Sequence, residues 1–103
     1  MKAVKVQYTV RQDYVSKNKE NIRRVMAALQ AKPVPGMQYS TYTDAEHPNT
    51  FIHINMAKDG PTMAKLGELP EFKAFRKALM ESNPIESPNQ TQLNLVGAGF
   101  ELA

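Results

Sequence analysis

The chain has 103 residues, of which 42% are hydrophobic and 22% charged, and its formal net charge is +3. This length suits one domain over residues 1–103, because a second independent core would need more chain. The absence of cysteine excludes disulfides, thiolate catalysis and sulfur-ligated metal clusters. The first residues lack the apolar core of a secretory signal, and no stretch approaches the roughly 20 apolar residues of a membrane span. The default expectation is a cytoplasmic protein.

The first half of the chain predicts a strand followed by a long helix. From Ala3 to Val10, apolar and polar residues alternate, which is the period-two pattern of a strand with one buried face. Apolar residues then recur at helical spacing up to about Lys32. The segment Pro33-Val34-Pro35-Gly36 ends this helix, because proline removes backbone donors and glycine favours a turn.

The second half predicts a hairpin, a broken helical region and a last strand. Residues 37–43 and 50–56 are rich in β-forming residues and are separated by a segment with the composition of a turn. A helical region opens after Asp59, breaks near Gly67 and restarts at Pro70. A proline-bearing loop then precedes a last strand, expected at about Thr91–Val96.

This order of elements is typical of the ferredoxin-like β-α-β-β-α-β fold, an α+β class with an antiparallel sheet whose first and third strands are central and whose helices cover one face. If Thr43 pairs with Thr50, the apolar residues of the hairpin lie under the helices. The opposite face then carries a polar and aromatic set, namely Lys5, Gln7, Thr9, Ser40, Tyr42, Phe51, His53 and Asn55, joined by Gln92 and Asn94 if Leu93 and Leu95 point inward. A slip of one residue in the register would exchange the two faces.

Two short stretches and the layout of nearly the whole chain resemble a known superfamily. The stretches are Pro35-Gly36-Met37-Gln38-Tyr39 and Leu69-Pro70-Glu71-Phe72-Lys73-Ala74-Phe75. They resemble the dimeric α/β-barrel superfamily, and within it the antibiotic biosynthesis monooxygenase-like proteins. The resemblance implies a homodimer in which two protomers pack sheet against sheet, with a ligand cavity on the face away from the helices. The polar and aromatic set named above would then bind a small aromatic or polar ligand.

The resemblance also implies candidate activities, because this group includes cofactor-independent oxygenases of quinols or polyphenols and haem-degrading enzymes. The sequence departs from these branches. Leu66 stands where many relatives carry a histidine, Arg76 stands where the haem-degrading branch has one, and the chain has no tryptophan. These departures disfavour haem degradation, and no motif indicates a metal, flavin or haem cofactor. Whether the ligand reacts or is only bound is left open by the residues.

His53 is the candidate catalytic residue, because an imidazole with an ordinary pKa of about 6.5 can take a proton from a phenolic substrate at neutral pH. The substrate anion would then react directly with oxygen. The alternative is a histidine that is only hydrogen-bonded at a dimer interface. Asp44, Glu46 and His47 could suggest a metal site, but they lie in one turn without a second group of ligands, so turn chemistry is the better interpretation.

RNA-recognition modules share this order of strands and helices and display aromatic side chains on the open face of the sheet. Residues 50–56 offer only Phe51 for base stacking, and Tyr8 is expected under the helices. Nucleic-acid binding therefore ranks third, behind a ligand-binding dimer and a cofactor-independent oxygenase.

Overall fold

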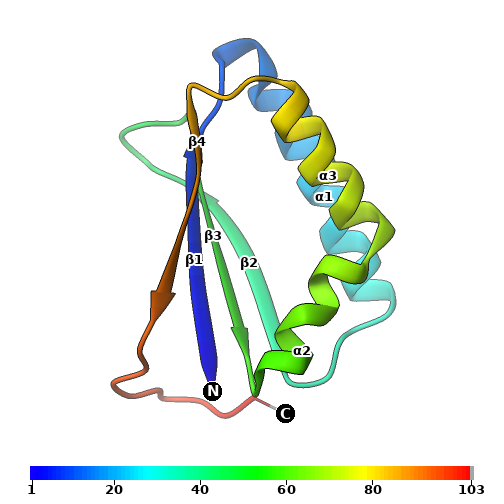
Figure 1. The fold of residues 1–103 in the computed structure, drawn as a ribbon, viewed down its shortest axis with the longest axis vertical. Coiled ribbons are helices and arrows are strands. Elements are labelled where there is room, and N and C mark those ends of the chain that lie inside the picture. The colour runs from blue at the N-terminus through cyan, green and yellow to red at the C-terminus, as the bar shows by residue number, and fades with distance from the viewer. Residues whose placement is uncertain (103) are drawn as a thin grey trace.

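The structure is a computed structural model that describes residues 1–102. The elements are β1 (Lys2–Thr9), η1 (Gln12–Tyr14), α1 (Val15–Ala31), β2 (Met37–Thr43), β3 (Thr50–Ala57), α2 (Gly60–Ala64), η2 (Lys65–Glu68), α3 (Pro70–Glu81) and β4 (Glu86–Leu93). The strands form one antiparallel sheet in the order β2-β3-β1-β4. Figure 1 shows α1 and α3 on one side of this sheet. The predicted ferredoxin-like fold, with the first and third strands central, is confirmed.

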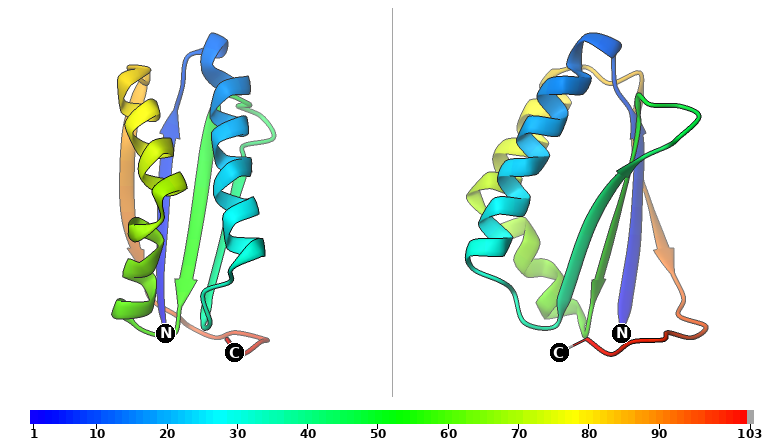
Figure 2. Two further views of the ribbon diagram at one scale, coloured as in Figure 1. Left: turned by 90° about the vertical axis from the view of Figure 1, so that its right-hand side faces the viewer. Right: turned by 180° about the vertical axis from the view of Figure 1, so that it is seen from behind.

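The helical layer lies over one face, and the opposite face of the sheet, which we name the uncovered face, has no helix on it. Figure 2 shows α1 and α3 side by side, with α2 and η2 continuing the line of α3 toward the far end of the sheet. No helix in the described part of the chain is long and apolar enough to cross a membrane. The two faces of the sheet therefore have different surroundings.

Local signals account for the helix boundaries. The carboxylate of Asp59 accepts a hydrogen bond of 2.8 Å from the backbone N–H of Thr62, which caps α2. Pro70 stands in the first turn of α3, where a missing N–H costs nothing. Gly36 has φ of 78°, a conformation that glycine adopts freely, and its carbonyl accepts from the N–H of Lys58 at 2.8 Å. The predicted break before Pro70 is confirmed and runs through η2.

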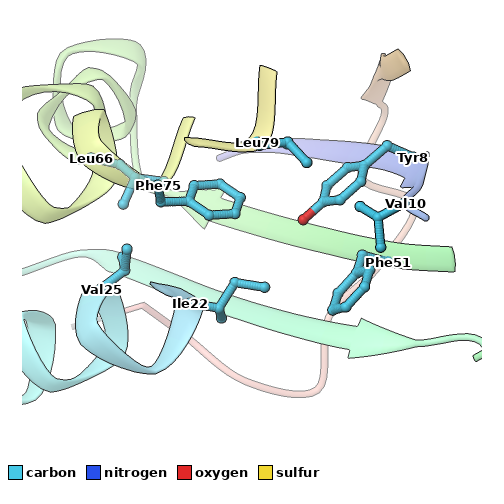
Figure 3. Packing of buried hydrophobic residues seen from close by; sticks show 8 residues of the cluster. All are labelled: Tyr8, Val10, Ile22, Val25, Phe51, Leu66, Phe75 and Leu79. Carbon is cyan, nitrogen blue, oxygen red and sulfur yellow. The ribbon is translucent and has the colours of Figure 1, made fainter. Parts of the chain in front are cut away.

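The core lies between the helices and the sheet. Its buried side chains come from β1, α1, β3, η2 and α3 and from Val10 just after β1 (Figure 3), and they are Tyr8, Val10, Ile22, Val25, Phe51, Leu66, Phe75 and Leu79. The rings of Tyr8 and Phe51 stack across neighbouring strands with their centroids 5.6 Å apart. In Figure 3 the hydroxyl of Tyr8 points inward, toward the side of the cluster where Phe75 lies. A polar group therefore stands inside an otherwise apolar layer.

The predicted register of the β2–β3 hairpin is wrong by one residue. Thr43 pairs with Phe51 and not with Thr50. Phe51, His53 and Asn55 consequently face the helices, while Ile52, Ile54 and Met56 lie on the uncovered face. The pairing with β1 agrees, because it sets Tyr8 opposite Phe51 and Val6 opposite His53.

The physical reason for this error is that both sides of β3 carry apolar residues. Periodicity alone therefore cannot say which side is buried. The polar character of His53 and Asn55 suggested the open face, but a buried polar side chain is stable where the fold supplies hydrogen-bond partners. Lys5, Gln7, Thr9, Ser40 and Tyr42 do lie on the uncovered face, as their pairing with β3 shows.

The last strand also differs from its prediction, since it begins at Glu86 instead of Thr91 and ends at Leu93. β4 is an edge strand, and the ladder shifts between Gln7 and Thr9, so that two residues, Ser87 and Pro88, stand opposite Tyr8. A proline is tolerated at an edge or a bulge of this kind. Gln92 pairs with Val4 and is therefore on the helix side, whereas Leu93 pairs with Ala3 on the uncovered face. Asn94 lies outside the strand.

Candidate functional site

A pocket of about 620 Å³ lies between the sheet and the segment from α2 to α3. Its walls are mostly apolar and aromatic, and its polar or charged lining residues include Tyr8, Tyr39, His53, Asn55, Arg76 and Gln90. This pocket is on the helix side, whereas the sequence placed the cavity on the opposite face. Of the residues predicted to bind a ligand, it is lined by His53 and Asn55 only. The other predicted ligand-binding residues do not line this pocket, and their role stays a prediction. They are Lys5, Gln7, Thr9, Ser40, Tyr42, Phe51, Gln92 and Asn94.

His53 is the centre of a buried hydrogen-bond network. Its Nε2 lies 2.7 Å from the hydroxyl of Tyr8 on β1, and its Nδ1 lies 2.5 Å from the hydroxyl of Tyr39 on β2. Thr41 Oγ1 lies 3.0 Å from the same Nδ1. On the far side of Tyr8, Asn18 of α1 donates from Nδ2 to the phenol oxygen at 2.9 Å. The network therefore connects three strands with α1.

Burial makes this network uncharged at neutral pH. Desolvation lowers the pKa of His53 to about 4, because the protonated imidazole would lose its hydration inside the protein. Desolvation likewise raises the pKa values of Tyr8 and Tyr39, so both phenols keep their protons. The expectation of an ordinary imidazole pKa is thus wrong for His53. With both ring nitrogens occupied and a low proton affinity, His53 is placed poorly for direct attack on a substrate proton.

Two further polar residues line the pocket. Asn55 is only 9% exposed, and its Oδ1 is buried without a hydrogen-bond partner. Arg76 is exposed on α3, with its guanidinium carbon 6.0 Å from the ring centroid of Phe72, and it forms no salt bridge within residues 1–102. A ligand anion can reach Arg76, whereas the Oδ1 of Asn55 is closed off from the pocket surface.

Sequence reasoning did not identify Tyr8, Tyr39 or Arg76 as site residues. Both tyrosines were placed correctly under the helices, but only as core residues. Arg76 follows Phe72 by four residues, so the two lie on the same face of a helix. That spacing could have indicated that both side chains line the same pocket.

The cluster at Asp44, Glu46 and His47 has the geometry of a turn. Asp44 Oδ1 accepts from the N–H of Glu46 at 2.9 Å, and its Oδ2 lies 3.8 Å from the ring of His47. These bonds use the carboxylate to close the loop between β2 and β3. We assign this cluster a structural role.

The comparison with known proteins places the fold. No family model matches the sequence, and no curated protein matches it. Solved structures do match, among them an antibiotic biosynthesis monooxygenase with a TM-score of 0.81 over 94% of this chain and 100% of that chain, at 13% identity. The chain has the fold of the antibiotic biosynthesis monooxygenases.

Two other similar structures span almost the same length. Rv0793 from Mycobacterium tuberculosis is 15% identical, with a TM-score of 0.79, over 96% of this chain and 98% of that chain. SnoaB, a cofactor-independent oxygenase from Streptomyces nogalater, is 16% identical, with a TM-score of 0.71, over 97% of each chain. At these identities the likeness establishes a shared fold, and it confirms the resemblance inferred from the layout of the sequence.

Burial of a neutral His53 predicts that stability falls as the pH falls. The unfolded imidazole takes up a proton below about pH 6.5, whereas the folded one stays neutral until about pH 4. Protons therefore bind the unfolded state preferentially between these values and lower the free energy of unfolding. Urea unfolding should show a loss of about 2 kcal/mol from this group between about pH 7 and about pH 5.

The matched control uses the other histidine of the chain. His47→Gln removes an exposed imidazole and should keep the loss of stability attributed to His53, whereas His53→Gln should lose the part attributed to burial. An unchanged pH dependence in His53→Gln would contradict the assignment.

Proposed function

We propose that the pocket on the helix side binds a small aromatic ligand that carries hydroxyl or carbonyl oxygens. The observation that carries this proposal is the continuous group of aromatic rings in the pocket wall, with the exposed Arg76 beside it. A flat ring system can pack against such a wall, and its oxygens can pair with Arg76 at the exposed side.

The shape of the walls supports an aromatic ligand. Tyr39, His53, Phe72 and Phe75 form a continuous group of rings, with neighbouring centroids 5.4–6.1 Å apart. Rings at these separations favour offset or edge contacts with a further flat ring system. Arg76 adds a cation at the exposed side of this group, where it can pair with a ligand oxygen that carries negative charge.

A second candidate function is cofactor-independent oxygenation of a quinol or polyphenol. SnoaB, which has the same fold, is described as a cofactor-independent oxygenase. An uncharged pocket with a cation at one side would stabilise a substrate anion, which is the species that reacts with oxygen in this scheme. Because His53 is a weak base here, we assign the stabilisation of the anion to Arg76 and the polar lining groups.

The test of the primary proposal is a thermal-shift screen with quinols and polycyclic phenols. At 100 times its dissociation constant, a bound ligand should add about 2.7 kcal/mol of stability. Arg76→Gln should weaken the best compound roughly tenfold, as expected for loss of a charge-assisted hydrogen bond. Lys77→Gln makes the same charge change at the next, exposed position, which does not line the pocket, and should leave the affinity unchanged.

Two outcomes of this screen would count against the proposal. If no aromatic compound stabilises the protein, the pocket does not have the proposed role. If the two variants weaken binding equally, Arg76 acts only through net charge. Oxygen uptake with the compounds that bind then decides the second function, since a protein that only binds would consume no oxygen above the uncatalysed rate.

We propose in addition that the protein is a homodimer that pairs through the uncovered face. Ile52, Ile54 and Met56 are half-buried on that face, and Tyr42 is 56% exposed beside them. Such a row of apolar side chains on an open sheet is typical of an interaction surface. Packing two copies face to face would remove these side chains from water.

Light scattering of purified variants tests the dimer. The wild-type protein should have about twice the mass of one chain at micromolar concentration, and Ile54→Asp should have the mass of one, because a carboxylate cannot be buried there without a partner. Ile85→Asp is the matched control, since Ile85 is 63% exposed in the loop before β4. A monomeric wild type, or a dimer in Ile54→Asp, would contradict the proposed interface.

A further inference from the structure

The hydrogen bonds around His53 have a direction, and Asn18 sets it. Asn18 is fully buried, and its Nδ2 donates to the phenol oxygen of Tyr8. Because that oxygen accepts from Asn18, the proton of Tyr8 is free to go to Nε2 of His53 at 2.7 Å. A neutral imidazole that accepts at Nε2 carries its proton at Nδ1.

The opposite direction is less favourable. With Asn18 as observed, it would leave the buried hydroxyl proton of Tyr8 without an acceptor. With the amide of Asn18 turned around, Oδ1 would accept from Tyr8 and the two N–H groups would be left in the core. In the observed arrangement the group without a partner is Oδ1. An orphaned buried N–H is rarer in proteins than an under-satisfied carbonyl oxygen, so the observed orientation is the better one.

The protonated Nδ1 donates toward Tyr39 and Thr41, whose oxygens lie 2.5 and 3.0 Å away. Tyr39 then accepts from the imidazole and does not donate to it. Thr41 is a further side-chain hydrogen-bond partner of Tyr39. When Thr41 donates in that pair, no hydrogen bond within residues 1–102 uses the hydroxyl proton of Tyr39. Tyr39 lines the pocket, whereas Thr41 does not. The chain of donors that starts at Asn18 therefore ends with an unused O–H at the pocket wall.

We propose that Tyr39 donates this hydrogen bond to an oxygen of the bound ligand, and that the pocket consequently selects the phenolate form of a phenolic ligand. This inference rests on the proposed function, because it requires an aromatic ligand in the pocket. Each hydrogen bond in the chain polarises the next one, so the last donor is stronger than an isolated phenol. The ionised oxygen of a phenolate accepts such a bond more strongly than a neutral hydroxyl does.

The charges around the pocket agree with an anionic ligand. The titratable groups that line it are Tyr8, Tyr39, His53 and Arg76, and no carboxylate of the described residues is among them. Burial raises the pKa of Tyr39, so its proton remains available for donation at neutral pH. Arg76 also favours an anion, and the experiment has to separate its effect from that of Tyr39.

The experiment uses alizarin, a hydroxyanthraquinone whose phenol and phenolate forms have different visible spectra. Titrating the dye with pH, free and in the presence of excess protein, gives its pKa in both states. We expect the bound dye to have a pKa lower by about one unit, which means that the phenolate binds roughly tenfold more tightly than the phenol. Tyr39→Phe should abolish most of this shift while the dye still binds.

Two variants control this measurement. Tyr42→Phe removes a hydroxyl from the uncovered face and should keep the full shift. Arg76→Gln should weaken binding and remove part of the pKa shift. Adding Tyr39→Phe to this variant should remove more of the pKa shift. If the dye binds with an unshifted pKa, or if Tyr39→Phe keeps the shift, the inference is overturned and the pocket function stands. If neither alizarin nor any other phenol binds, both are overturned.

The tautomer of His53 tests the direction of the chain without any ligand or variant. Long-range proton–nitrogen spectra of the ¹⁵N-labelled protein at neutral pH distinguish a protonated Nδ1 from a protonated Nε2. The inference requires Nδ1–H for His53. A protonated Nε2 would mean that Nδ1 accepts from Tyr39 or Thr41, and would overturn it.

Discussion

The rest of the structure depends on one constraint, which is that a buried histidine needs hydrogen-bond partners for both of its ring nitrogens. His53 is 4% exposed in the middle of β3, and an imidazole there is costly unless both ring nitrogens have partners. Tyr8 and Tyr39 supply those partners from the two strands that flank β3. The same bonds hold the register of the sheet, because a slip of one residue would move His53 to the uncovered face and leave both tyrosine hydroxyls in the core.

This arrangement also gives the pocket its chemistry. The hydrogen-bonded Tyr8, Tyr39 and His53 reach it in neutral form, Arg76 adds a cation at its exposed side, and the surrounding rings are apolar. A site of this kind is suited to holding a flat ligand in one orientation, because fixed donors and acceptors need no rearrangement on binding. It is poorly suited to a mechanism in which His53 itself takes a proton, so we assign recognition of the ligand to Tyr39 and Arg76.

Local signals made much of the fold predictable. The alternation in β1, the helical spacing that ends before Pro33, the cap at Asp59 and the restart at Pro70 depend on residues close together in the chain. The face of β3 depended instead on partners 45 and 14 residues away from His53, which no period-two pattern contains. The early start of β4 depended on a bulge opposite Tyr8 that accommodates Pro88, and the sequence alone indicated a loop there.

The site was only partly predictable for the same reason. His53 and Asn55 stood out as polar residues in an apolar strand, and they do line one pocket, but the error in register placed that pocket on the wrong side of the sheet. Tyr39 was expected under the helices, but the role of its hydroxyl depends on its contact with His53. A polar residue inside a strand whose two faces are both apolar is therefore better interpreted together with the tyrosines and asparagines that could pair with it.

The most direct test is a pH titration of the histidine ring protons by NMR, with the His47→Gln variant used to assign the signals of His53. We expect His53 to stay neutral down to about pH 4 to 5, because its charged form would be desolvated. Titration of His53 near the ordinary value of about 6.5 would contradict this expectation. That result would mean that the imidazole is exposed to water and that the network, the register and the pocket built on it are misplaced.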